Sequence, residues 1–156
     1  MSDKREQILL RLKAILETIP TIVTVVRNRG LMDNDSRPAA YLLDGDESFR
    51  LTGDRKGRVT MSQELITMRP QIFVIGKSLK PQNEGVGAAL NGYRIGIIRA
   101  IAQDAALLAL VGSNGDIAYN GCETDLKNGS LLDGQLRLDF AITYVLDPYD
   151  QPPPYE

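Results

Sequence analysis

The sequence predicts an α+β fold: one largely antiparallel or mixed sheet, with an N-terminal helix and a long central helix packed on it. Helical and strand-like patterns follow one another in the order helix, three strands, long helix, two strands, which is typical of α+β folds. The length of 156 residues suits one domain, and 43% hydrophobic and 24% charged residues are usual for a globular protein. We expect a single domain over residues 1–147 and a disordered tail over 148–156.

The first helix is expected over residues 3–19. Asp3 followed by Glu6 resembles a capping box at its start, and Pro20 ends it, because the residue before a proline avoids the helical region. Six apolar residues recur at helical spacing and should form the buried stripe: Ile8, Leu9, Leu12, Ile15, Leu16 and Ile19.

Three strands follow the first helix. The β-branched segment 22–27 is the first of them, and residues 39–43 form a short second one. Residues 44–58 are polar and are expected to form a loop or an exposed hairpin arm. Residues 59–76 form the third strand, bent at Pro70, and its apolar second half, IFVIG, is expected at the centre of the sheet.

A long helix is expected over residues 86–111. One side of it carries the large residues Leu90, Tyr93, Ile97, Ile98, Ile101 and Leu108. The other side carries the small residues Ala88, Gly92, Gly96, Ala102 and Ala106. Either the helix packs flat on the sheet, or it is wedged between the sheet and a second surface such as a neighbouring subunit.

Two further strands complete the fold. Residues 116–125 contain a glycine and are expected to bulge. Residues 134–146 alternate between apolar and mixed side chains, so one face of this strand should be buried.

Composition excludes several functional classes. The chain has no histidine and no tryptophan, so it lacks Ser-His-Asp and Cys-His triads and histidine-ligated zinc. A net charge of -2 disfavours a general nucleic-acid binder. Cys122 is the single cysteine, and we expect a small, semi-buried apolar residue rather than a reactive thiol.

Neither a signal peptide nor a membrane span is expected. The N-terminus MSDKREQILLRLK has no continuous apolar core, and no apolar run approaches the roughly 20 residues that a spanning helix needs. The sequence therefore predicts a soluble, intracellular protein.

The segment 44–58 is the candidate interaction site, with an acidic half followed by a basic half. Its charged residues are Asp44, Asp46, Glu47, Arg50, Arg55, Lys56 and Arg58. A calcium loop would need glycine at its sixth position and glutamate at its twelfth, where Phe49 and Arg55 stand. The segment is either a solvated arm or a contact to another subunit, since an acidic patch could meet a neighbour's basic one in a ring. We expect no catalytic residues, no bound cofactor and no metal.

The whole layout resembles the tail terminator, or minor tail, proteins of long-tailed bacteriophages and related prophages. An amphipathic helix (REQILLRLKAILETI) leads into a β-branched strand and an arginine-containing loop (VVRNRG). An IFVIG strand, an Ala/Ile-rich helix and a final alternating strand (LRLDFAITYVLDP) follow. The resemblance covers nearly the whole chain, but it includes no motif that assigns a function to a single residue.

The resemblance implies a structural protein of the virion. Such proteins form a ring, typically a hexamer, on the last ring of the tail tube, stop tube polymerisation and provide the end that docks onto the head. The implied partners are other copies of the chain, the tail tube protein and a head–tail connector or stopper protein. Genomic DNA would pass through the lumen without specific binding, and no membrane is involved. The implied location is the neck of the virion, and the host cytoplasm during assembly.

Two alternatives remain open from the sequence. The chain could be a different neck component, such as a joining or stopper protein, which shares small α+β folds and ring assembly. It could instead be a small cytosolic enzyme that uses carboxylates and arginines alone, in which case Asp, Glu and Arg side chains should converge in a concave pocket.

Overall fold

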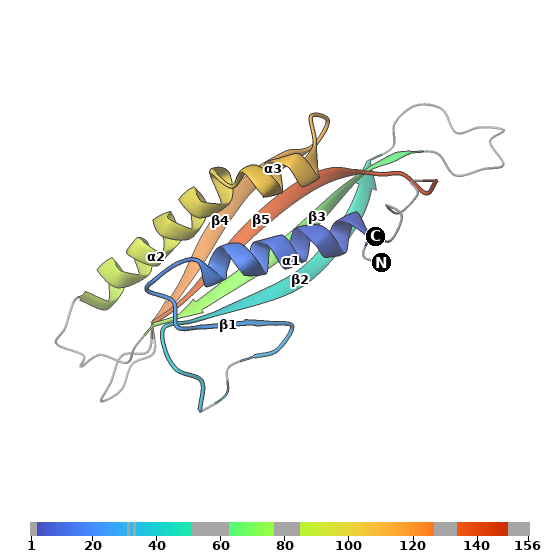
Figure 1. Cartoon of the computed structure of the whole chain (residues 1–156). Coiled ribbons are helices and arrows are strands. Elements are labelled where there is room, and N and C mark those ends of the chain that lie inside the picture. The colour runs from blue at the N-terminus through green and yellow to red at the C-terminus, as the bar shows by residue number, and fades with distance from the viewer. Residues whose placement is uncertain are drawn as a thin grey trace.

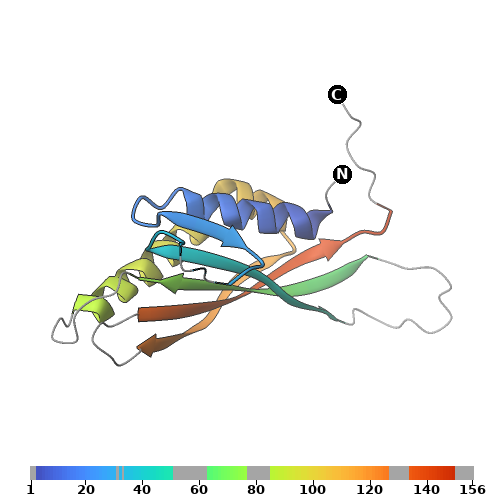
Figure 2. The ribbon, with the colours of Figure 1, turned by 90° about the horizontal axis from the view of Figure 1, so that it is seen from below.

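The computed structural model describes residues 3–30, 32, 34–50, 63–76, 85–126 and 134–149 of the chain. A five-stranded mixed sheet is covered on one face by three helices, and its other face is bare of helices (Figures 1 and 2). The strands are β1 (Thr24–Arg27), β2 (Ala39–Arg50), β3 (Glu64–Ile75), β4 (Asp116–Leu126) and β5 (Gly134–Leu146). The helices are α1 (Lys4–Glu17), α2 (Gly85–Ala102) and α3 (Ala105–Val111). The predicted α+β class is confirmed.

The strands lie in the order β1-β2-β3-β5-β4. Strands β1 and β2 are parallel, and every other neighbouring pair is antiparallel. Strand β3 is therefore the middle strand, as predicted for the IFVIG segment. The two edges of the sheet are β4 and the short β1.

Helix α1 begins and packs as the sequence predicts. The Asp3 side chain accepts a hydrogen bond from the Glu6 amide at 2.8 Å, so it satisfies one of the free N–H groups of the first turn. The predicted stripe is buried from Ile8 to Leu16, while Ile19 lies beyond the helix and is half-buried. This stripe faces the sheet and joins the main hydrophobic core.

Strand β2 is longer than the sequence predicts. It continues through residues 44–50, which were expected to form a loop or arm, and it pairs with β3 as far as Arg50. The register shifts between Leu43 and Asp46, opposite Pro70 of β3. Proline has no N–H for a central ladder, so the bulge with Gly45 at φ 70° absorbs the interruption and lets the strand continue.

The expected long helix is two helices. Helix α2 ends at Ala102, and Asp104 begins α3 by accepting a hydrogen bond from the Leu107 amide at 2.8 Å. The restart changes which residues face the core: Leu107 is fully buried, and Leu108, expected on the buried side, is 50% exposed. The small-residue side of α2 is largely exposed, and an added Cβ at Gly92 or Gly96 would meet nothing within 4 Å among the described residues.

Asp104 also connects helix α3 to helix α1. It accepts two hydrogen bonds from the Arg11 guanidinium of α1, at 2.8 and 2.6 Å, and this contact lowers the pKa of the Asp104 carboxyl. A single carboxylate thus caps α3 and holds α1 against it.

Replacing this carboxylate should measurably destabilise the domain. We expect Asp104→Ala to lower the free energy of unfolding by about 1 to 2 kcal/mol, because the cap and a charge-assisted pair are both lost. Asp104→Asn keeps a capping oxygen and should lose about half as much. Urea unfolding at neutral pH measures both; equal losses would show that the cap contributes nothing.

The last two strands behave as predicted, apart from one residue. Strand β5 alternates between buried and half-buried residues along its length, and β4 shifts register between Tyr119 and Gly121, as expected of a bulge. Cys122, expected to be semi-buried, is exposed. It lies on the edge strand just past this bulge, so it has strand neighbours on one side only.

Candidate interaction surfaces

The structure separates the acidic residues that cluster in the sequence. Asp44 accepts hydrogen bonds from Arg27 at 2.7 Å, and Glu47 lies 3.3 Å from the Nε of Arg5. Asp46 is exposed and pairs with Arg69 in the strand register. The first two carboxylates therefore take part in the contacts that hold α1 to the sheet, while Asp46 and Glu47 are both exposed.

Arg27 is the centre of the ion-pair network beneath α1. Its guanidinium donates to both oxygens of Asp44 and to both oxygens of Glu6 on α1, with all four distances between 2.7 and 2.9 Å. The arginine side chain is 19% exposed. Its hydrogen bonds lower the pKa of both carboxyl groups, so this network is a structural clamp between β1, β2 and α1.

Most of the basic half of the predicted site falls outside the part of the chain that the structure describes. Arg55, Lys56 and Arg58 fall outside the described residues, and the side chain of Arg50 is not described. The contact role predicted for the basic half remains a prediction.

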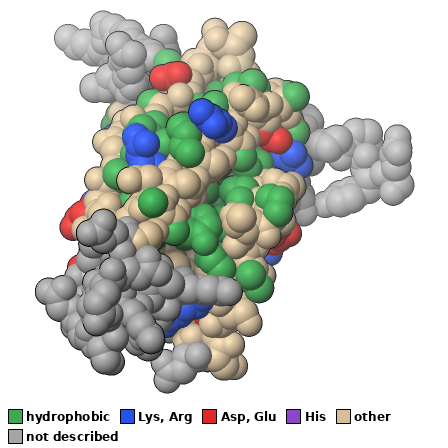
Figure 3. All heavy atoms as spheres, turned by 90° about the vertical axis from the view of Figure 1, so that its left-hand side faces the viewer, with side chains coloured by type: hydrophobic (Ala, Val, Ile, Leu, Met, Phe, Trp, Pro, Cys, Tyr) green, Lys and Arg blue, Asp and Glu red, His purple; other side chains and the backbone are tan. Residues whose placement is uncertain are grey.

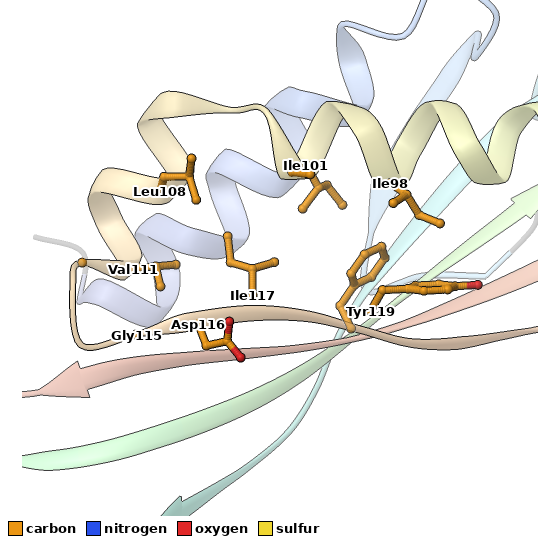
Figure 4. A pocket seen from close by; sticks show the side chains of 11 residues that line it. Ile98, Ile101, Leu108, Val111, Gly115, Asp116, Ile117 and Tyr119 are labelled. Atoms are coloured by element: carbon orange, nitrogen blue, oxygen red, sulfur yellow. The ribbon is translucent and has the colours of Figure 1, made fainter.

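An apolar groove lies where the helical layer meets the edge strand β4 (Figure 4). It has a volume of about 280 Å³. We call it the edge groove; it is lined by Ile98, Ile101, Ala102, Leu108, Val111, Gly112, Gly115, Asp116, Ile117, Tyr119 and Phe140. The isoleucines of α2 and the side chains of α3 point down into it, while Ile117 and Tyr119 rise from β4 and Asp116 points away below the strand.

Tyr119 closes one end of the edge groove. Its ring packs against Phe140 with the centroids 5.7 Å apart, and its hydroxyl accepts a hydrogen bond from the Arg94 Nε at 3.0 Å. Burial raises the pKa of the Tyr119 hydroxyl, so it stays neutral at physiological pH. The groove therefore presents apolar surface with one neutral polar group at its end.

The bare face of the sheet is apolar at one corner, around Tyr41, Phe73 and Ile75, and carries polar and charged side chains along the rest of its described strands. Thr67 bonds Thr143 at 2.9 Å, and Gln71 donates to Asp139 at 3.0 Å. By the strand register, its described charged side chains are Asp46, Arg69, Asp116, Glu123, Asp125, Arg137 and Asp139. Among these described strand side chains, five carboxylates outnumber two guanidinium groups.

A second hollow lies at one corner of the bare face. It has a volume of about 330 Å³ and is lined by Arg29, Gly30, Tyr41, Leu43, Phe73, Ile75 and Gln135. Asp35 holds Arg29 through two hydrogen bonds of 2.9 Å and accepts a third from the Tyr41 hydroxyl at 3.0 Å. These bonds hold the pKa of Asp35 far below its usual range, while burial and Asp35 raise the pKa of Tyr41 to about 12.

The view onto the end of the molecule where β3 ends and β5 begins shows hydrophobic side chains in the middle of the described surface, with charged ones around them (Figure 3). Apolar surface at the rim of a sheet is typical of contact sites between proteins.

The two hollows differ in their described polar groups. The edge groove is apolar, with Asp116 pointing away below its strand, whereas the corner hollow holds the Arg29 guanidinium, whose partner Asp35 also bonds the Tyr41 hydroxyl. Among the described residues no group of three or more Cys, Asp or Glu side chains is arranged to hold a metal ion. No described helix is long and apolar enough to span a bilayer.

No protein-family model matches the chain, and no curated protein sequence matches it.

Sequence reasoning missed the groups that organise these surfaces. The sequence analysis assigned no role to Arg5, Arg11 or Arg27, yet each one joins α1 to another element. The spacing of Arg11 and Asp104, 93 residues apart, carries no local signal. The edge groove could not be foreseen because it depends on the break between α2 and α3.

Proposed function

We propose that this chain is a structural ring protein of a phage tail, placed at the head-proximal end of the tail tube, where it ends tube polymerisation and provides the surface that docks onto the head. The resemblance in layout suggests this role, and the structure supports the layout it rests on. The element order matches the expected one, apart from the split of the long helix.

The observation that carries the proposal is a sheet with helices on one face only among the described residues, whose end strands β1 and β4 each pair with one described strand. Exposed sheet edges are ready templates for pairing with another chain, and most stable proteins cover or blunt them. A protein that works by assembly needs such surfaces. The excess of carboxylates among the described strand side chains of the bare face also suits a ring that DNA traverses, since it would not hold the phosphate backbone.

Native mass spectrometry and negative-stain microscopy over a concentration series test this proposal. We expect closed rings, with a hexamer as the main species, in the protein alone or on added tail tubes. Capped tubes of fixed length would support a terminator, whereas rings that bind only head-side proteins would identify a different neck component. A chain that stays monomeric at every concentration, with and without tubes, would refute the proposal.

The structure also indicates which residues can test a contact role for the charged segment 44–58. Reversal of Asp44 or Glu47 would break the contacts that hold α1 and is unsuitable, whereas Asp46 is exposed. If the segment makes subunit contacts, the combined variant Asp46→Lys, Arg55→Glu, Lys56→Glu and Arg58→Glu should not assemble into rings. Circular dichroism should show that this variant is still folded. Normal rings from this variant would exclude the segment as a contact.

A further inference from the structure

We infer that neighbouring copies of this chain join edge to edge, with β1 of one copy pairing along β4 of the next and its apolar Val23 seated in the edge groove. This inference rests on the proposed ring and names the contact that closes it. Four observations carry it.

The first observation is strand direction. Strand β3 is antiparallel to both β2 and β5, and β4 is antiparallel to β5, so β4 runs in the direction of β3. Strand β1 runs with β2, opposite to β4. A second copy that continues the sheet in the same orientation therefore brings its β1 antiparallel to β4, the arrangement that gives well-aligned ladder hydrogen bonds.

The second observation is the length of the free ladder. The bulge after Tyr119 interrupts β4, which leaves the continuous segment Asp116–Tyr119 next to the groove. Strand β1 has 4 residues, Thr24–Arg27. The two segments match in length, and the bulge would prevent a longer, unspecific strand from pairing along the whole edge.

The third observation is the width of the two layers. Five strands at about 4.8 Å give a sheet about 24 Å wide, and α2 and α3 follow each other along one side of α1, so two rows of helices cover it (Figure 1). Two rows about 10 Å apart cover about 20 Å. The two rows therefore nearly span the sheet, and the edge groove opens beneath the α2–α3 row at the last strand, β4 (Figure 4).

The fourth observation is apolar complementarity. Val23, directly before β1, is 64% exposed, although its amide already donates to Pro38 beside the sheet at 2.8 Å. The groove at the opposite edge leaves Leu108 50% exposed. Two apolar surfaces at opposite edges make a head-to-tail contact, which closes into a ring when the rotation between copies allows it.

Site-specific crosslinking tests the contact. In a Cys122→Ser background, we would combine Val23→Cys with Leu108→Cys and treat the full chain with a short bis-maleimide. The matched control combines Val23→Cys with Ala109→Cys, because Ala109 is exposed and next to Leu108 but does not line the groove. We expect a ladder of covalent oligomers up to ring size, about tenfold or more above the control, because assembly raises the local concentration of the two thiols.

The outcomes separate this inference from the proposed function. Rings by native mass spectrometry with equal crosslinking in both variants would overturn the edge contact and leave the ring role standing. A chain that stays monomeric with and without tail tubes and shows no excess crosslinking would overturn both. Excess crosslinking that stops at a dimer would overturn closure through this edge, because a head-to-tail contact continues around the ring.

Discussion

Arg27→Met should lower the free energy of unfolding by about 2 to 3 kcal/mol, a large share of the 5 to 15 kcal/mol typical of a domain. Methionine keeps the length and the apolar stem of arginine, so packing changes little. What is lost is a guanidinium that bonds all four oxygens of Glu6 and Asp44. The two carboxylates then face each other in a half-buried space without the guanidinium that bridges them.

The pH dependence distinguishes this clamp from a packing effect. The pKa of Asp44 and of Glu6 is lowered in the folded chain, first by the hydrogen bonds from Arg27. A lowered folded pKa gives stability that is fully present above the ordinary carboxyl values near 4 and is lost as the pH falls through the folded pKa. The difference between the native chain and Arg27→Met should therefore be largest near pH 7 and should shrink below about pH 4.

Urea unfolding at pH 7 and at pH 3.5 measures this difference. Arg99→Met, an exposed position on α2, is the control and should change stability by less than about 0.5 kcal/mol at both values. A loss at Arg27 that is independent of pH would mean that the side chain acts through packing alone.

Local periodicity was enough to predict most of the elements. The stripe of α1 and the alternation of β5 each bury one face of their element, so tertiary contacts reinforce what the pattern already favours. The break between α2 and α3 had a local signal, an aspartate before AALLALV. This signal was overlooked because apolar residues recur at helical spacing on both sides of it. Helix propensity alone therefore predicted one continuous helix, where the Asp104 cap separates two.

The continuation of β2 and the position of the clamp could not be predicted locally. Asp44 and Glu47 read as loop residues because their partners, Arg27 and Arg5, come from segments far away in sequence. Nor does the sequence show that β1 joins β2 in parallel, since this requires a connection that returns to the same end of the sheet. The structure adds an intramolecular role for Asp44 and Glu47 that the sequence did not predict, and the contact role of the segment remains a prediction.

Gly45→Ala should be the most damaging small substitution in the sheet. A Cβ at this position would lie 1.9 Å from the Arg69 carbonyl oxygen and 2.8 Å from its carbon, both backbone atoms of the central strand. The residue also has φ +70°, a conformation that costs a non-glycine residue about 1 kcal/mol or more. To remove this clash, β2 would have to move away from β3 next to Pro70, where the described ladder between the two strands is already interrupted. We expect a loss of at least about 3 kcal/mol.

The matched control should change the free energy of unfolding in the opposite direction. Gly92→Ala, inside α2, would meet nothing within 4 Å, and alanine stabilises a helix interior by up to about 1 kcal/mol over glycine. Thermal and urea unfolding of both variants give the comparison. Since the bulge at Gly45 also carries the carbonyl that accepts a hydrogen bond from Arg5 at 3.0 Å, the variant should loosen α1 as well, seen as faster amide exchange in α1. If Gly45→Ala is as stable as the native chain, the bulge does not hold β2 in register, and the extension of β2 past Asp44 must depend on contacts further along the strand.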